Sequence, residues 1–343
     1  MKKFKRSKDY GFFDQDFRLE KLSKLGDPLV KLKSGIDFEI FRKLLEEGLY
    51  KVPKGKGGRR PYDYVLMFKI LILQRYYNLS DTQIEYQIND RMSFMRFLDL
   101  TISDDVPDSN TVWNFTEILT DLELVKPLFE IFEQELERLN LIVNQGKIID
   151  ASFVEAPRQR NSRDDNKHIK ETKSAPKEWE SKPNKLAQKD IDASWTKKNF
   201  QNYFGYKNHA KVDSKSKIIT EYKVTTASVH DSQVVGDLLN EKDNGEALYA
   251  DSAYVGQDHV LQKHNIIDQI HEKGYKNKPL TKSQKESNKE KSKTRARVEH
   301  VFGFMENSMG SMYFRKIGVK RAETVIGLMN LTYNMFRKIQ LTT

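Results

Sequence analysis

The sequence contains no cysteine, which excludes disulfide bonds, thiolate metal sites and cysteine nucleophiles. No apolar run reaches the roughly 18 residues that a transmembrane helix needs. The basic start of the chain, residues 1–6, is not followed by the apolar segment of a secretory signal. The Gly-x-Ser-x-Gly motif and the Walker phosphate loop are also missing. These absences predict a cytoplasmic protein without a membrane partner.

Positive charge is abundant. The 343 residues include 59 Lys and Arg against 49 Asp and Glu, a formal net charge of +10. An excess of this size favours a polyanionic partner. Without a membrane segment, nucleic acid is the simplest such partner. Five histidines show no tight zinc-ligand spacing, so structural roles are favoured for His209, His230, His264, His271 and His300.

Residues 1–140 predict a helical N-terminal DNA-binding region. One short helix is expected before residue 37, and others over residues 38–47, 62–77, 81–89, 91–98, 111–120 and 125–139. Asp37, Pro61 and the Ser80–Gln83 pair are expected to start three of them. Short helices joined by short turns are typical of helix-turn-helix modules, but also of bundles that bind nothing.

A glycine-rich basic loop covers residues 51–60. It is either a solvated linker or a loop that contacts phosphates. On the second interpretation the DNA-contacting side chains are Lys54, Lys56, Arg59 and Arg60.

Two strand-like runs in the second half each end in an aspartate, Asp150 and Asp251, and a late helix carries Glu299. The order of elements predicts an α/β fold for residues 141–343, a ribonuclease-H-like mixed sheet with flanking helices. In that arrangement the first and fourth strands are neighbours, so the three carboxylates converge. Carboxylate oxygens are the ligands that Mg²⁺ prefers, and two such ions can hold the attacking and leaving oxygens of a phosphoryl transfer.

Residues 155–203 contain few aliphatic side chains and predict a mobile excursion from the sheet. Trp179 and Trp195 are expected to be local anchors, with base stacking as the alternative. A second basic run, residues 276–297, leads into the helix of Glu299 with nine Lys or Arg. Such a run is often only a solvated face, but its position favours contact with a DNA backbone by Lys291, Lys293, Arg295 and Arg297.

With these residues in view, the chain resembles bacterial insertion-sequence transposases of the DDE type, in the branch named after insertion sequence five. The resemblance covers most of the chain and rests on "LSDTQIEYQINDRMSFMRFLDL", "VPDSNTVWNF", "IIDASFVEAPRQRN", "FGYKNHAKVD", "TTASVHDSQ", "YADSAYVG", "RARVEHVFG" and "IGLMNLTYN". Lys207 and His209, in the fourth of these motifs, join the candidate DNA contacts.

The resemblance implies cutting and joining of double-stranded DNA at terminal inverted repeats and at a target, by a homodimer assembled on DNA. It also implies two Mg²⁺ or Mn²⁺ ions per active site, with Asp150 contacting both ions and Asp251 and Glu299 one each. The family's arginine falls on Arg295. Two positions depart from the family pattern, Ser292 in place of a tyrosine and Glu306 in place of a lysine.

Two other functions stay open at this point. One is an end-binding repressor or domesticated descendant without catalysis, and the other is a nuclease that cuts without joining. The sequence does not distinguish whether second-strand cleavage passes through a hairpin.

Overall fold

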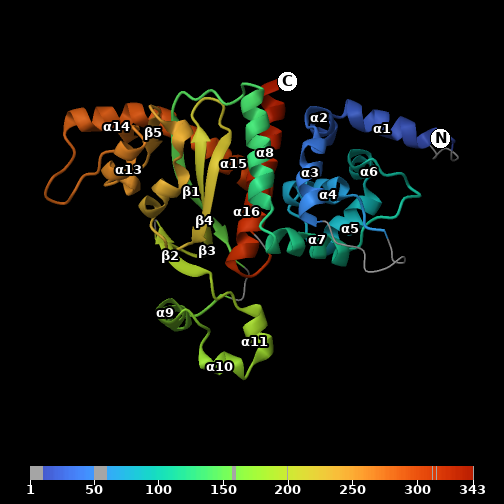
Figure 1. Cartoon of the computed structure of the whole chain (residues 1–343), viewed down its shortest axis with the longest axis horizontal. Helices are drawn as coiled ribbons and strands as arrows, with labels where there is room; N and C mark the ends of the chain where they lie inside the picture. The colour runs from blue at the N-terminus through green and yellow to red at the C-terminus, as the bar shows by residue number, and fades with distance from the viewer. Residues whose placement is uncertain are drawn as a thin grey trace, which may run out of the picture.

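A computed structural model describes residues 11–49, 60–156, 160–198, 200–310, 312–313 and 315–342. The N-terminal helices form a body on one side of a central sheet, and a small helical lobe projects from one end of that sheet (Figure 1). The predicted loop residues Lys54, Lys56 and Arg59 lie outside the described residues.

The N-terminal body is all helical, as predicted. It consists of α1 (Asp14–Lys24), α2 (Pro28–Gly35), the 3-10 helix η1 (Phe38–Phe41), α3 (Arg42–Leu49), α4 (Tyr64–Tyr76), α5 (Asp81–Asp90), α6 (Met92–Leu98), α7 (Ser109–Asp121) and α8 (Val125–Arg138). Two helices rather than one precede residue 37.

Side-chain caps set several of these helix starts. Asp37 caps η1, and the Ser80–Gln83 capping box starts α5, as predicted. The predicted start at Pro61 is wrong. The Asp63 carboxylate accepts the backbone N–H of Leu66, so α4 begins at Tyr64 and the proline lies outside the helix.

The sheet has six strands, β1 (Lys147–Glu155), β2 (Ser194–Lys198), β3 (Gln201–Asp213), β4 (Ile219–Thr226), β5 (Ala247–Ala250) and β6 (Ile267–Ile270). β1 pairs antiparallel with β3 and parallel with β5. β6 extends the parallel side beyond β5, while β2 and β4 both pair antiparallel with β3. The expected pairing of the two Asp-terminated strands is confirmed, and with it the mixed α/β fold.

The remaining elements are short except at the C-terminus. They are α9 (Arg163–Thr172), α10 (Lys177–Glu180), α11 (Pro183–Gln188), η2 (Asp231–Val234), α12 (Val235–Leu238), η3 (Glu241–Asp243), η4 (Ser252–Tyr254), α13 (Asp258–Lys263), α14 (Lys282–Arg295), η5 (Ala296–Val298), α15 (Glu299–Asn307) and α16 (Val319–Thr342). No helix in the described part of the chain is both long enough and apolar enough to cross a membrane.

The excursion has more structure than the sequence predicts. Its described part folds into α9, α10 and α11 and returns through β2, which pairs with β3 (Figure 1). Trp179 is 1% exposed, so it anchors the lobe locally, as expected. At the base, Asp190 accepts hydrogen bonds from the Tyr206 hydroxyl of β3 and from the backbone N–H of Gly318. One buried aromatic and a few polar contacts replace the aliphatic core that the segment lacks.

Helix α16 lies between the sheet and the N-terminal helices, beside α8 (Figure 1). Two asparagines, one helical turn apart, attach it to the sheet. Asn330 exchanges two amide hydrogen bonds with Asn208 of β3. Asn334 accepts from the N–H of Ile219 at 2.9 Å and donates to its C=O at 2.8 Å. One apolar core therefore runs from the N-terminal helices through α16 to the sheet.

Gly327 allows this close packing. A Cβ atom at this position would lie 2.4 Å from the Tyr222 hydroxyl of β4 and 2.7 Å from a methyl carbon of Val125 in α8. Only a residue without a side chain lets α16 approach both elements at once.

Candidate active site

Asp150 lies in β1, and Asp251 directly follows the neighbouring parallel strand β5 at the same level. The β1–β5 register pairs Lys147 with Leu248 and Ile148 with Tyr249, and continuing it by two residues brings the two aspartates opposite each other. The Asp150 carboxylate accepts the N–H of Ala151 at 2.8 Å. The Asp251 carboxylate caps η4 by accepting the N–H of Ala253 at 2.8 Å. Both side chains are thus fixed by the backbone next to them.

Arg295 connects Glu299 to Asp150 by contacting both carboxylates. Arg295 ends α14, and Glu299 begins α15 four residues later. The guanidinium lies 3.3 Å from an Asp150 oxygen through Nη1 and 3.2 Å from a Glu299 oxygen through Nη2. Its Nε is buried and has no hydrogen-bond partner among the described residues. Arg295 is therefore placed where positive charge balances two of the three carboxylates.

Burial dominates the electrostatics of Asp150. Loss of water around the side chain raises its pKa to about 6, and the nearby negative charge of Asp251 adds to this rise. The N–H of Ala151 and the charge of Arg295 oppose the rise but do not cancel it. A carboxylate in this state gains from any cation that comes close.

The donor set suits a divalent cation chemically, because three carboxylates offer the hard oxygen atoms that Mg²⁺ and Mn²⁺ bind. The described residues nevertheless contain no group of three acidic or histidine side chains gathered closely enough to hold an ion. Arg295 forms ion pairs with Asp150 and Glu299 and so supplies the positive charge next to these two carboxylates.

The end of α14 also contacts strand β6. Lys291 donates to the C=O of Ile270 at 2.9 Å. Ser292, at the family's tyrosine position, lies 3.2 Å from the Nε2 atom of His271. Burial lowers the pKa of His271, and the charge of Arg295 lowers it further. These contacts fix the last turn of α14 next to the carboxylates. Glu306, the other departure from the family pattern, is exposed on α15.

Two predicted DNA contacts are buried. His209 is 0% exposed, and its Nε2 lies 2.8 Å from the Thr225 hydroxyl. Burial lowers the pKa of His209 to about 4, so it is neutral at pH 7. Lys207 is 7% exposed and donates to the Val229 C=O and to Asp231, both at 2.7 Å. Neither side chain is accessible to a DNA phosphate in this structure.

The other described candidates are more accessible. Lys293 forms an ion pair with Glu290 on the exposed face of α14. Arg297 donates to the C=O of Ser214 at 2.8 Å. Arg60 is exposed before α4. Their DNA contacts remain a prediction.

Two residues near the carboxylates, Tyr254 and Asp231, had no role predicted from the sequence. Tyr254 is 1% exposed and its hydroxyl has no partner among the described residues. Burial raises its pKa well above the usual value, with further increases from the charges of Asp150, Asp231 and Asp251. Tyr254 belongs to the motif "YADSAYVG" and Asp231 to the motif "TTASVHDSQ". These two motifs were the only indication in the sequence that the residues lie near the site.

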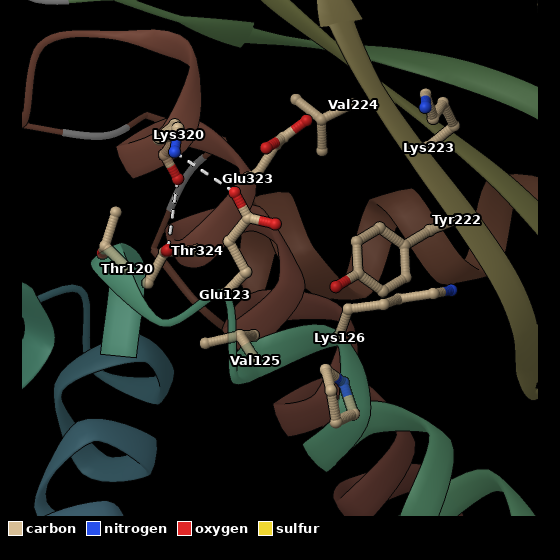
Figure 2. A pocket seen from close by; sticks show the side chains of 11 residues that line it. Thr120, Glu123, Val125, Lys126, Tyr222, Lys223, Val224, Lys320, Glu323 and Thr324 are labelled. Atoms are coloured by element: carbon tan, nitrogen blue, oxygen red, sulfur yellow. Dashed lines mark hydrogen bonds and ion pairs between the residues drawn. The ribbon is translucent and has the colours of Figure 1, made fainter. Parts of the chain in front are cut away.

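A cavity of about 380 Å³ lies away from the three carboxylates, where β4, α16 and the α7–α8 turn meet. Figure 2 shows Tyr222 and Lys126 along one side and the paired Lys320 and Glu123 on another. Lys126 is itself paired with Glu221. Because these lysines already have carboxylate partners, the cavity has no evident charge preference and is a weak candidate for a functional site.

Comparison with known families agrees with this geometry. A family model described as "Transposase DDE domain" matches residues 143–335, and one described as "Transposase domain (DUF772)" matches residues 17–117. The first match covers more than half of the chain and includes Asp150, Asp251 and Glu299.

A solved structure, "Cryo-EM structure of piggyBac transposase synaptic complex with hairpin DNA (SNHP)", is similar with a TM-score of 0.45 and 12% sequence identity. The similarity covers 92% of this chain and 75% of that one. It is too low to carry weight by itself. The family match, however, shows that this chain belongs to the DDE transposases.

Proposed function

We propose that this transposase binds the terminal inverted repeats of its element and cuts and joins DNA at Asp150, Asp251 and Glu299. The observation that carries the proposal is that the register of the neighbouring parallel strands β1 and β5 places the two aspartates opposite each other. Arg295 connects Asp150 to Glu299. Inverted repeats and target DNA as substrates, and a pair of chains on the DNA, follow from the family resemblance.

Mg²⁺ or Mn²⁺ is the cofactor we propose, held by the three carboxylates. When bound, two such ions would stabilise the attacking and leaving oxygens of a phosphoryl transfer. The protein's own contribution is to hold Asp150 and Asp251 against backbone N–H groups, so that each carboxylate keeps its orientation. Arg295, which now pairs with Asp150 and Glu299, would be available to a DNA phosphate if a cation replaced one of these contacts.

The first test uses Asp150→Asn, Asp251→Asn and Glu299→Gln, which keep shape but remove a ligand charge. We expect each to reduce Mg²⁺-dependent cleavage of labelled end DNA by roughly a hundredfold or more, since each removes a group acting at the transition state. DNA binding should stay within about twofold in gel shifts. Near-wild-type cleavage by any one variant would remove that residue from the site.

Matched controls change exposed carboxylates outside the proposed site. Glu306→Gln changes an exposed carboxylate on α15, and Asp258→Asn changes one on α13. Both should cleave normally. Strand joining to a target plasmid separates a transposase from a nuclease. DNA binding by wild type without any cleavage would favour the end-binding repressor.

Metal binding has a readout that does not depend on activity. Ions that bind only the folded state raise its stability. We expect about 10 mM Mg²⁺ to raise the Tm of the wild type by roughly 2–4 °C, which corresponds to about 1 kcal/mol. The Asp150→Asn variant should lose this shift and Glu306→Gln should keep it. An equal shift in all three proteins would mean that the ion binds elsewhere.

A further inference from the structure

A second cavity, of about 350 Å³, lies where α4, α5, α7 and α16 meet beside the excursion lobe. Its lining includes Trp113 and Glu117 of α7 and Arg321 near the N-terminal end of α16. None of the three catalytic carboxylates lines it. Its lining is rich in basic side chains, namely Arg75, Arg315, Lys316 and Arg321.

The positive charges in this cavity exceed the negative ones. Glu117 alone accepts from both Lys316, at 3.1 Å, and Arg321, at 2.7 Å. Arg315 donates to the neutral side chain of Asn78 at 2.7 Å and forms no ion pair with a described carboxylate. One glutamate therefore pairs with two cations, while Arg315 has only neutral partners, the Asn78 amide and the Tyr313 ring, 5.7 Å from its guanidinium carbon.

Arg75 is the least satisfied of the four. Its guanidinium makes no hydrogen bond to any described residue, and its Nε is buried. The negative charge of Asp81 favours the charged form of Arg75. The Asp81 carboxylate, however, accepts a hydrogen bond from the Gln74 amide at 2.7 Å. Burial lowers the pKa of Arg75 to about 10, so the group stays charged at neutral pH. Arg75 as a whole is half-buried, and a cation that loses water without gaining a partner at its buried Nε becomes more favourable when an anion binds next to it.

We propose that this cavity binds a phosphodiester group of DNA, gripped by Arg75 and Arg315. The proposal rests on the proposed DNA transposition. Guanidinium groups match phosphate geometry with paired N–H donors. Trp113, 47% exposed on the cavity lining, offers a surface on which a sugar or base can stack.

The cavity is within reach of DNA bound at the active site. Arg315 also lines a neighbouring cavity together with Glu155 and Arg160. Glu155 lies on β1, five residues after Asp150, a span of roughly 17 Å. That length corresponds to about five base pairs of B-DNA. A duplex with its reacting phosphate at Asp150 that follows β1 can therefore reach Glu155 and the cavity that Glu155 shares with Arg315.

The test measures binding of the full-length chain to a duplex carrying the DNA that brackets its coding frame, by fluorescence anisotropy over a salt series. We expect Arg75→Gln and Arg315→Gln each to weaken binding roughly tenfold. Each should also reduce the slope of log K against log salt by about one, because one phosphate contact is lost. Arg315→Lys keeps the charge and should keep the slope.

Folding and charge controls accompany these variants. Arg75→Gln removes an unpaired buried charge, so its Tm should not fall. Arg138→Gln removes an exposed arginine, paired locally with Glu135, and should bind as wild type does. Trp113→Phe should reduce the DNA-induced quenching of tryptophan fluorescence, because Trp179 is buried and Trp195 is partly buried.

The outcomes separate the two proposals. If the wild type binds with a steep salt dependence and both glutamine variants match it, the cavity proposal is overturned and DNA binding stands. If the wild type does not bind the duplex at any salt concentration, the proposed function fails. If inorganic phosphate then raises the Tm of wild type but not of Arg75→Gln, the cavity holds a free anion, and DNA as its ligand is overturned.

Discussion

At the scale of single residues, Asp150 is a carboxylate whose negative charge is unfavourable in its surroundings. Its side chain is 17% exposed and shares its surroundings with Asp251, and Arg295 compensates only in part. A carboxyl group whose pKa rises on folding binds its proton more tightly in the folded state. Its contribution to stability is complete below the unfolded pKa, near 3.8, and is lost as the pH rises through about 6.

Replacing Asp150 by asparagine tests this effect. We expect the free energy of unfolding of Asp150→Asn to equal or fall slightly below that of the wild type at pH 4. At pH 7 it should exceed the wild-type value by roughly 1–3 kcal/mol. Urea unfolding of both proteins across this range measures the difference. His209, whose pKa burial lowers to about 4, titrates in both proteins and cancels. A difference that does not change with pH would contradict the raised pKa.

At the scale of elements, β3 explains why two basic side chains were expected at the surface and are not there. The strand has β1 on one side and β4 on the other, and its residues from Phe204 to Asp213 are all buried. Lys207 and His209 are two residues apart and therefore point to the same face of a strand that is buried on both faces, so their charge does not indicate exposure. Asp231 and the Thr225 hydroxyl, supplied by the chain that follows β3, satisfy them instead.

The excursion lobe carries the prediction for this scale. Limited proteolysis should cut between residues 160 and 193 before it cuts the sheet, because the lobe buries few apolar side chains. Trp179→Ala removes its largest buried group, so we expect cleavage there to become several times faster. Phe200→Ala, at a side chain that is 94% exposed, is the aromatic control and should change nothing. Resistance of the lobe in both variants would mean that other contacts hold it.

At the scale of the whole molecule, α16 makes the N-terminal helices and the sheet one folding unit. Its apolar residues belong to the same core as those of α4, α7 and α8. Its asparagines meanwhile satisfy the polar groups of β3 and β4. The motif "IGLMNLTYN" thus has a structural reason, since Gly327, Asn330 and Asn334 all lie where α16 approaches the sheet.

Asn334→Ala should destabilise the entire chain. It leaves the buried N–H and C=O of Ile219 unpaired, so we expect a loss of roughly 2–4 kcal/mol. Circular dichroism and tryptophan fluorescence should still report one unfolding transition, shifted to lower urea. Asn307→Ala, which removes only a local bond to Gly303 on α15, should cost less than about 1 kcal/mol. Two separate transitions would indicate that the helical body and the sheet unfold independently.

The sequence by itself was enough for the features that depend on neighbours along the chain. The Ser80–Gln83 capping box, the alternation of β4 and the apolar runs that end at Asp150 and Asp251 depend on contacts a few residues apart. The pairing of the two Asp-terminated strands was predictable as well, because parallel strands need crossover connections and few orders then fit. The strand β2, within the segment expected to be mobile, was not predicted.

Only the tertiary structure decided the partners of the charged side chains. Arg295 joins Asp150 across 145 positions of sequence, Lys207 meets Asp231, and Arg75 is left without a carboxylate. A cation has the same appearance in a sequence whether its partner is water, a carboxylate or nothing. The difference lies in burial and in long-range pairing, which local periodicity does not contain.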